Sequence, residues 1–310
     1  MKIAVIGSGG VGGFYGLKLA RAGHDVTFVA RGAHLRAMQE SGLHIENESG
    51  IVESLASVNV TDDILSLKQP DLILIAVKMW DLEGVASTLK KIAGPQTAVL
   101  SLQNGVIKDI ILKRIFDEEA VMGGVAYVAT SIGRPGVIKQ VGPMQRIKVG
   151  EYNGRKSARS EELVRSFASM GVDATLADDI ERVLWEKFVF LVGLSSMTCL
   201  THLTIGPVRE HEGSRNLLQT IIEEAVAVGR ARGVHLPEDY AKQCMQLVDN
   251  VAYAMTSSMY HDLEKGNRIE LPWLSGGVVS LAREAGVPAP ANTFATQVLD
   301  PYVNGRPKAA

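Results

Sequence analysis

Residues 1–31 read MKIAVIGSGGVGGFYGLKLARAGHDVTFVAR, and this stretch predicts the fold of the first half of the chain. The short apolar run KIAVI precedes a glycine-rich turn, a helical pattern follows near residues 12–22, and a second apolar run, DVTFVA, comes after it. A strand, a glycine turn, a helix and a second strand in this order are typical of a dinucleotide-binding β-α-β unit.

The turn itself, Gly7-Ser8-Gly9-Gly10-Val11-Gly12, fits the pattern G-x-G-x-x-G. The first glycine permits the tight turn, the second lets the backbone approach a pyrophosphate, and the third permits close packing of the helix on the strand. The helix N-terminus adds N–H groups and positive potential. We therefore expect this turn to bind the phosphates of a dinucleotide; the alternative is a glycine-rich turn that binds nothing.

A basic residue occupies the position that distinguishes NAD-binding from NADP-binding units. In NAD-binding units an Asp or Glu about 20 residues after the glycines binds the ribose hydroxyls, but this chain has Ala30 and Arg31 there. A guanidinium binds a 2′-phosphate with paired donors, and Lys78, at the end of DLILIAVK, adds positive charge at the same edge of the sheet. The sequence thus favours NADP; the alternative is that Arg31 and Lys78 are ordinary solvated charges.

The later patterns indicate two domains. The apolar runs DLILIAV, AVLSLQ and VMGGVAYVA are continuous and alternate with helical patterns, which predicts a doubly wound parallel α/β sheet buried on both faces. Glycine and proline punctuate two short β segments over residues 131–151, which favours antiparallel additions at the sheet edge. From residue 178 onward the patterns are helical, so we predict a Rossmann domain over 1–177 and an all-helical domain over 178–310.

Composition excludes several function classes. The formal net charge of −2 gives no reason to expect nucleic acid or an anionic membrane as a partner. The most apolar stretch, around residues 184–203, carries Glu186, Lys187 and His202, and its uninterrupted part is shorter than the ~20 residues that span a bilayer. The two cysteines, Cys199 and Cys244, have no metal-binding spacing, so we expect reduced core thiols, a soluble cytoplasmic protein and no metal site.

Two charged residues stand out in the second half. Lys187 lies in VLWEKFVFLVGL, which is apolar nearly all round and therefore expected to be buried, where an ammonium needs an opposite charge, a functional role or a route to water. The alternatives are that the aliphatic part of Lys187 is buried while its ammonium reaches water, or that Lys187 forms a local ion pair with Glu186. Glu270 stands just before Leu271-Pro272 and a new helix, where an acid also interacts favourably with the helix dipole.

Three further polar residues lie in less specific patterns. Asn104, in Gln103-Asn104-Gly105 after AVLSLQ, is a candidate for the rim of the site at the carboxyl ends of the strands, or a residue of a flexible Asn-Gly turn. Ser257 and Ser258, in AMTSSMYHDLEKGN, have the character of ordinary polar helix residues. The sequence patterns alone assign none of these three residues a role.

Taken in order along nearly the whole chain, these segments resemble the ketopantoate reductases (2-dehydropantoate 2-reductases). The resemblance is carried by GSGGVG, the strand-end Arg31, AVKMWD, QNG, LWEKF and TSSMYHDLEKGNRIE. The glycine turn is common to many enzymes, whereas the lysine segment and the SSM…D…G.R.E segment are more specific. The resemblance implies a two-domain NADPH enzyme of pantothenate and coenzyme A biosynthesis whose partner is a small 2-oxo acid.

The resemblance also implies roles for matching residues. Hydride passes from the nicotinamide to the ketone carbon, and Lys187 hydrogen-bonds the carbonyl oxygen and donates a proton as the alkoxide forms. Glu270 orients the substrate hydroxyl and helps keep Lys187 charged. Asn104 and Ser258 fall where the family contacts substrate, and Asn104 also lies beside the cofactor. The long apolar helices leave room for a homodimer through the helical domain.

Several positions depart from the family pattern. Well-known members carry asparagines four and eight residues after the lysine, where this chain has Leu191 and Ser195. Met255 and Pro272 likewise replace residues that are usually polar. A pocket built to hydrogen-bond a hydroxylated acid is weakened when donors become apolar. Reduction of another branched 2-oxo acid therefore stays open, as does a non-catalytic NADPH-binding redox sensor.

Overall fold

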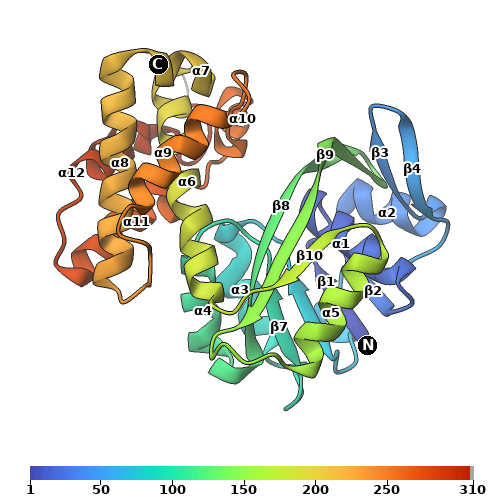
Figure 1. Ribbon diagram of the computed structural model, residues 1–310. Coiled ribbons are helices and arrows are strands. Elements are labelled where there is room, and N and C mark those ends of the chain that lie inside the picture. The colour runs from blue at the N-terminus through green and yellow to red at the C-terminus, as the bar shows by residue number, and fades with distance from the viewer. Residues whose placement is uncertain (308–310) are drawn as a thin grey trace. The chain divides into compact units, whose positions relative to one another are not determined.

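The computed structural model describes residues 1–307, which form two compact units. The first unit comprises residues 1–104 and 108–183, and the second comprises residues 105–107 together with the chain from residue 184 onward. Within residues 1–307 all strands belong to the first unit, and the second unit is helical (Figure 1).

A ten-stranded sheet forms the centre of the first unit. Its order is β4-β3-β9-β8-β7-β6-β1-β2-β5, and β10 pairs with β9 beside this path. The strands are β1 (Lys2–Ile6), β2 (Asp25–Val29), β3 (Leu43–Asn47), β4 (Gly50–Leu55), β5 (Asn59–Thr61), β6 (Leu72–Ile75), β7 (Ala98–Ser101), β8 (Val121–Arg134), β9 (Val137–Glu151) and β10 (Asp173–Leu176).

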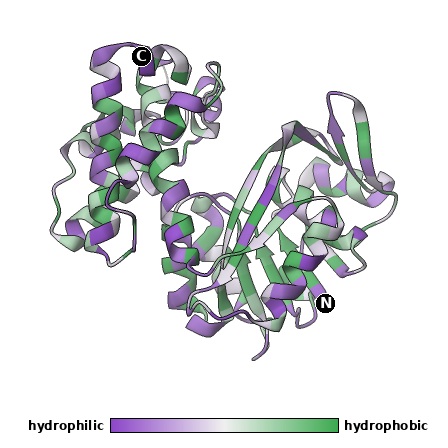
Figure 2. Cartoon of the chain, in the orientation of Figure 1, coloured by the Kyte–Doolittle hydropathy of each residue, from purple (hydrophilic) through white to green (hydrophobic). Residues whose placement is uncertain are grey.

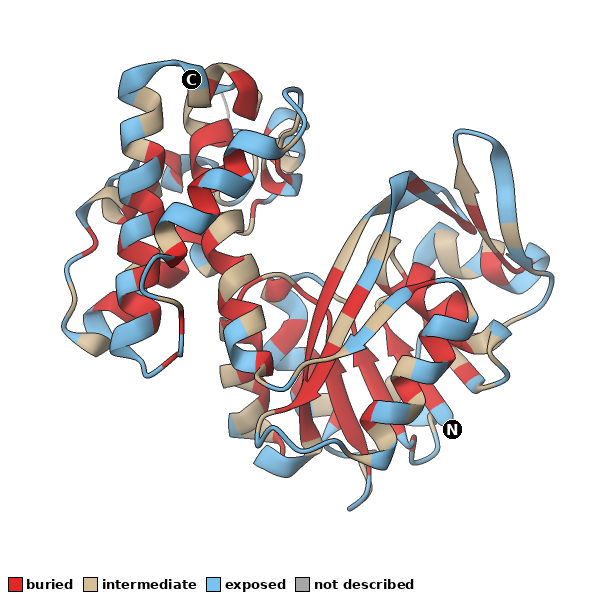
Figure 3. Ribbon diagram, in the orientation of Figure 1, coloured by how far each residue is buried: buried red, intermediate tan, exposed pale blue. Residues whose placement is uncertain are grey.

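The five predicted apolar runs form five neighbouring strands. Strands β2, β1, β6, β7 and β8 pair in this order, and every one of these pairs is parallel. Figure 2 shows these strands as largely hydrophobic, and Figure 3 shows them as largely buried, except for the second half of β8. The predicted α/β class with a doubly wound sheet is confirmed, and the carboxyl ends of all five strands meet at one edge.

Helices cover both faces of this sheet. The chain moves in one direction from β1 to β2 and in the opposite direction from β6 to β8, so right-handed crossovers place α1 on one face and α3 and α4 on the other. Helix α5 packs beside α1, with the rings of Tyr15 and Phe167 edge to face at 5.4 Å. The α-helices are α1 (Gly10–Arg21), α2 (Gly32–Ser41), α3 (Leu82–Leu89), α4 (Ile107–Ile115) and α5 (Ala158–Ser169).

The antiparallel addition expected in residues 131–151 is larger than two short segments. Strands β8 and β9 form one long hairpin, paired from Met122–Glu151 at its base to Arg134–Val137 at its turn. Strand β9 is not the margin of the sheet, because β3 pairs with it in parallel and β4 continues beyond β3. The outermost antiparallel strands therefore come from residues 43–55, where the sequence pattern is weak.

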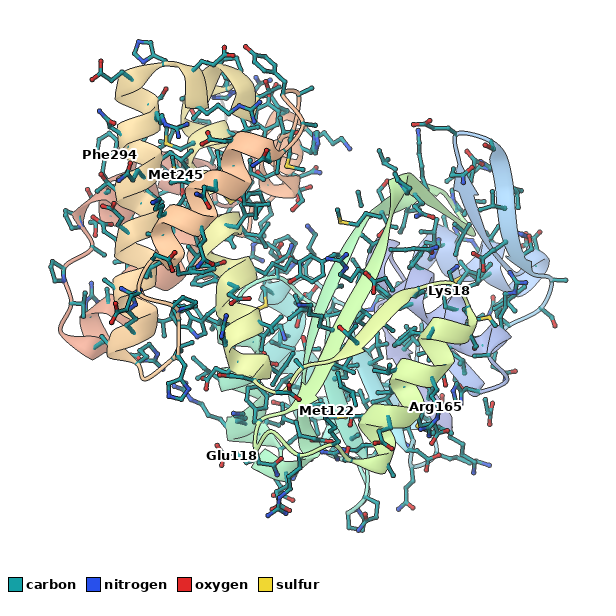
Figure 4. The ribbon with its side chains drawn as sticks, in the orientation of Figure 1. Lys18, Glu118, Met122, Arg165, Met245 and Phe294 are labelled. Carbon is teal, nitrogen blue, oxygen red and sulfur yellow. The ribbon has the colours of Figure 1, made fainter. Side chains whose placement is uncertain are left out.

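A buried ion pair holds the β3–β4 hairpin on helix α1. Lys18, labelled in Figure 4, is 3% exposed, pairs with Glu53 of β4 and donates to the carbonyl oxygen of Met170 at 3.1 Å. Arg21 binds the second Glu53 oxygen at 2.8 Å. Because an unpaired buried ammonium is costly, this contact requires β4 to stay on the helix that begins at the glycine turn.

The second unit is built around one long helix, α6 (Ile180–Thr201). By length and composition alone α6 could cross a membrane, but 67% of its most apolar window is buried, as in the core helix of a soluble protein. Cys199 and Cys244 are free and buried, and burial raises the pKa of each thiol to about 12. The other α-helices are α7 (Ile205–Glu210), α8 (Glu212–Ala231), α9 (Tyr240–Asn250), α10 (Ser258–Glu264), α11 (Ser275–Ala285) and α12 (Pro290–Leu299).

Short 3-10 turns complete the described structure. They are η1 (Ile64–Ser66), η2 (Met79–Asp81), η3 (Glu118–Ala120), η4 (Leu271–Trp273) and η5 (Asp300–Tyr302). Two of them matter for the candidate site, since η2 follows Lys78 and η4 follows Glu270.

A buried carboxylate on α8 caps helix α12 and provides a test of the helical unit. Glu224 accepts from the backbone N–H groups of Ala291 and Asn292 at 2.8 and 2.9 Å, and from the Asn292 amide at 2.8 Å. Hydrogen bonds to a charged group contribute about 1.5–3 kcal/mol each, so the loss of these three bonds in Glu224→Ala should lower the free energy of unfolding by at least about 4 kcal/mol. In thermal unfolding the midpoint should fall by roughly 10 °C, whereas Glu223→Ala, at the exposed neighbouring position, should leave it nearly unchanged. Equal midpoints for the two variants would contradict the capping role.

Candidate functional site at the carboxyl edge of the sheet and in the helical unit

Four candidate segments of the first unit follow four neighbouring strands. The glycine turn follows β1, Arg31 comes two residues after β2, Lys78 follows β6, and Asn104 follows β7. Because these strands are adjacent and parallel, their carboxyl ends lie at one edge. The structure therefore gathers the predicted cofactor-binding residues at the edge where open α/β sheets bind ligands.

The glycine turn has the close approaches that its three glycines imply. Gly7 has φ +89°, and a Cβ there would lie 2.8 Å from the Val77 backbone nitrogen. A Cβ on Gly12 would lie 2.1 Å from the Gly7 carbonyl oxygen, whereas one on Gly9 would have no atom within 4 Å. Helix α1 begins after Gly9 without a side-chain cap, so its first N–H groups are left for another acceptor. These residues fit the phosphates of a dinucleotide.

Two glycine variants separate folding from phosphate binding. Gly12→Ala forces a Cβ into the Gly7 carbonyl, so we expect it to lower the melting temperature and dinucleotide affinity together. Gly9→Ala keeps an ordinary backbone, at φ −73°, and fills only open space. We therefore expect an unchanged melting temperature with dinucleotide affinity reduced by at least about tenfold. Calorimetric titration with NADPH beside thermal unfolding measures both; full affinity in Gly9→Ala would refute the phosphate assignment.

Ser8 holds the turn in place through both its side chain and its backbone. Its side chain is buried and its Oγ donates to the Val29 carbonyl at 3.0 Å, while its N–H donates to the same oxygen at 3.2 Å. The Gly7 N–H also donates to Val29, at 3.3 Å. The turn is thereby fixed to the end of β2, immediately before Ala30 and Arg31.

Arg31 and Lys78 are exposed at this edge. Arg31 is the residue before α2, and within residues 1–307 its guanidinium makes no ion pair or hydrogen bond with the protein. Lys78 lies three residues beyond the end of β6, and its Nζ is 5.5 Å from the centre of the Trp80 ring. Arg31 at the start of a helix is thus placed to bind an anion with both its own charge and the helix N-terminus.

The loop after β7 is tied to the loop after β6. Gln103 donates from Nε2 to the Val77 carbonyl at 2.7 Å and accepts at Oε1 from Ser101 Oγ at 2.8 Å. The fully buried Lys108 donates to the Ser101 carbonyl at 3.0 Å and pairs with Asp109 at 2.7 Å. This network fixes both sides of the half-buried Asn104. Lys108 could not be found from the sequence, because a lysine directly followed by an acid forms no pattern that predicts full burial.

Lys187 lies in the second unit, on α6, and is half-buried. Its neighbours Trp185 and Phe188 are buried, with rings edge to face at 5.4 Å, and Tyr240 fixes the adjacent backbone by donating to the Glu186 carbonyl at 2.7 Å. The helix is therefore buried as predicted, but Lys187 itself reaches the surface of its unit. A half-buried ammonium on a rigid helix can both bind an oxygen and exchange its proton with water.

Glu270 and Ser258 belong to the same unit. Glu270 is a half-buried residue before η4, between Ile269 and Leu271, both fully buried, and it does not cap that turn with its side chain. Ser258 is exposed as the first residue of α10. Its neighbour Ser257 has a structural role, since its Oγ accepts from the Tyr260 N–H at 3.0 Å and lies 3.2 Å from Thr198 Oγ1 on α6. Of the two serines, Ser258 is the one open to a ligand.

The positions that depart from the family pattern are unequally exposed. Leu191 and Met255 are half-buried, Ser195 is 2% exposed and Pro272 is exposed. Leu191 and Ser195 follow Lys187 by one and two helical turns on the same face of α6.

The described residues, 1–307, contain no group of three or more His, Cys, Asp or Glu side chains arranged to hold a metal ion.

Comparison with known proteins covers both units. The family model described as Ketopantoate reductase PanE/ApbA matches residues 3–154, and the model for its C terminal part matches residues 179–303. A 2-dehydropantoate 2-reductase of Mesorhizobium japonicum is 30% identical over 311 residues, with 94% of each chain covered. A PanE/ApbA family ketopantoate reductase structure from Ralstonia eutropha has a TM-score of 0.87 at 30% identity, covering 98% of each chain. D-mandelate dehydrogenase with NADH and anilino(oxo)acetate shares the fold, with a TM-score of 0.86 at 21% identity over 98% of each chain.

Proposed function

Because the chain belongs to the ketopantoate reductase family, we propose that it uses NADPH to reduce 2-dehydropantoate to pantoate, a step toward pantothenate and coenzyme A. Its partner is then a small-molecule 2-oxo acid and its location the cytoplasm. The observation that carries the proposal is the half-buried Lys187 on a mostly buried apolar helix. A protonated lysine on a rigid helix can donate a proton to a ligand oxygen that lies beside it.

The proposed reaction assigns each residue one task. Bound NADPH would supply the hydride that adds to the ketone carbon. Lys187 Nζ hydrogen-bonds the ketone oxygen and transfers a proton to it as the carbon–oxygen double bond becomes a single bond, after which water restores the proton. Glu270 accepts a hydrogen bond from the substrate hydroxyl, and Asn104 and Ser258 donate to the remaining substrate oxygens.

The proposed cofactor is NADPH rather than NADH. The glycine turn offers N–H groups to the pyrophosphate, and the exposed Arg31 has no protein partner within the described residues that would compete with a 2′-phosphate. Lys78 adds positive charge at the same edge. No carboxylate stands at Ala30 or Arg31 to repel that phosphate.

Steady-state kinetics with purified protein test the substrate. Loss of NADPH absorbance is followed with 2-dehydropantoate and with 3-methyl-2-oxobutanoate, which lacks the hydroxymethyl group. A site that hydrogen-bonds the hydroxyl should prefer 2-dehydropantoate by at least about 100-fold in kcat/KM. NADPH binding without turnover on either acid would overturn the proposal in favour of a non-catalytic binding protein.

A second candidate is a reductase of a less polar branched 2-oxo acid. It is favoured by the half-buried apolar side chains of Leu191 and Met255, at positions where the family usually carries polar residues. The same kinetic comparison separates the two candidates, because this one predicts a higher kcat/KM for 3-methyl-2-oxobutanoate. The roles of Lys187 and the glycine turn would be unchanged.

A further inference from the structure

His34 connects three segments of the first unit: the glycine turn, helix α2 and the β8–β9 hairpin. It lies on α2, one turn after Arg31, and its Nε2 is 2.8 Å from the Ser8 carbonyl oxygen. The N–H of Gly136, in the turn between β8 and β9, donates to its Nδ1 at 3.1 Å. One imidazole thus joins the glycine turn to α2 and to the β8–β9 hairpin.

These contacts define the protonation state of the ring. Since Nδ1 accepts from the Gly136 N–H, it carries no proton, and Nε2 must carry the proton that it donates to Ser8. Partial burial lowers the pKa of His34, while the hydrogen bond to the Ser8 carbonyl opposes that shift. The neutral Nε2–H form is the one that satisfies both contacts.

The hydrogen bond to Ser8 sets the direction of the next N–H group. A peptide group is planar and trans, so the Ser8 carbonyl and the Gly9 N–H point in opposite directions. The helical hydrogen bonds of α1 begin with Gly13 N–H to the Gly9 carbonyl at 2.7 Å, one residue after Ser8. His34 therefore holds a peptide group that the helix does not, and directs the Gly9 N–H away from itself.

We propose that His34 is a positioning residue for the dinucleotide site: by holding the Ser8 carbonyl it orients the Gly9 N–H toward the pyrophosphate. This inference rests on the proposed function in needing a bound dinucleotide, and it adds a residue that touches no cofactor atom. The pyrophosphate is common to NADPH and NADH, so the effect of His34 is independent of the 2′-phosphate. Arg31, by contrast, acts on NADPH alone.

The test is calorimetric titration of His34→Ala with NADPH and, separately, with NADH. Loss of one oriented hydrogen bond should raise both dissociation constants by the same factor, about tenfold, and kcat at saturating NADPH should stay near the parent value. His44→Ala is the matched control, because His44 is also half-buried and lies beside two hydrogen-bond partners, Ser54 Oγ and Ser41 O, away from the glycine turn. Its two dissociation constants should not change.

Two conservative variants keep the test decisive if His34→Ala does not fold. The Gln amide nitrogen reaches the Nε2 position and can still donate to Ser8, whereas the Asn amide reaches only the Nδ1 position. His34→Gln should restore most of the affinity and His34→Asn should not. Equal affinities for the two variants, or a loss confined to NADPH, would overturn the role of the Ser8 contact.

The outcomes also separate this inference from the proposed function. Parent protein that binds dinucleotide but reduces no 2-oxo acid would overturn the function and leave the His34 prediction standing. Parent protein that reduces 2-dehydropantoate while His34→Ala binds both dinucleotides normally would overturn only the role of His34. Parent protein that binds neither dinucleotide would overturn both.

Discussion

Lys187→Ala should nearly abolish turnover while leaving NADPH binding nearly intact. A general acid that also binds the developing alkoxide contributes about 10² to 10⁴ in rate, so we expect kcat to fall by about 10³. The glycine turn and Arg31 belong to the other unit, and their affinity for NADPH should change less than about twofold. Stopped-flow or steady-state absorbance with 2-dehydropantoate measures the first quantity, and calorimetric titration with NADPH the second.

Two variants sharpen this prediction. Lys187→Arg keeps the positive charge but presents a guanidinium that does not release its proton, so it should bind substrate and remain slow. Lys242→Ala removes an exposed lysine from α9 of the same unit and should retain full activity. A Lys187→Ala enzyme within about tenfold of the parent kcat is incompatible with proton donation by this residue.

Arg31→Ala should reduce the preference for NADPH over NADH by about 30-fold. A charge-assisted contact with the 2′-phosphate is worth about 2 kcal/mol, and that phosphate is absent from NADH. The ratio of kcat/KM values for the two cofactors, measured with one 2-oxo acid, gives the change directly. NADH kinetics should be almost unaffected, since Arg31 has no ion pair within the described residues whose loss would disturb the fold.

Arg36 provides the matched control for Arg31. It is an exposed arginine on the same helix α2, five residues further on, and Arg36→Ala should leave the cofactor ratio unchanged. An equal change in both variants would indicate a general electrostatic effect of α2. No change in Arg31→Ala would remove the basis for choosing NADPH.

The parallel half of the sheet could be predicted because its strands carry their own signal. Runs such as KIAVI and DLILIAV are apolar on both faces, and helices cover both faces in the structure. Strands β3 and β4 have no such apolar run, and Ile51 and Val52 of β4 are exposed. The Lys18–Glu53 ion pair holds this hairpin on α1 instead. An Asn47-to-Gly50 turn, with the Ser49 N–H donating to Asn47 at 2.8 Å, was the available local clue.

The residues of the candidate site also fall into those that the sequence could predict and those that it could not. Residues that follow strand ends, such as Arg31 and Asn104, could be placed at one edge from strand order alone. His34 could not, because its role depends on a carbonyl 26 positions earlier and an N–H 102 positions later. Lys187 stands out in the sequence because it lies in an apolar helix, but its role as a proton donor is inferred from the resemblance to a family.

The most direct test of the account is to follow the hydride itself. NADPH carrying deuterium at the transferring position of the nicotinamide is incubated with the protein and 2-dehydropantoate, and the product is analysed by mass spectrometry. We expect pantoate with a deuterium on the carbon that was the ketone, and Lys187→Ala should form this labelled product about a thousandfold more slowly. Unlabelled pantoate, or no pantoate from protein that binds NADPH, would contradict it.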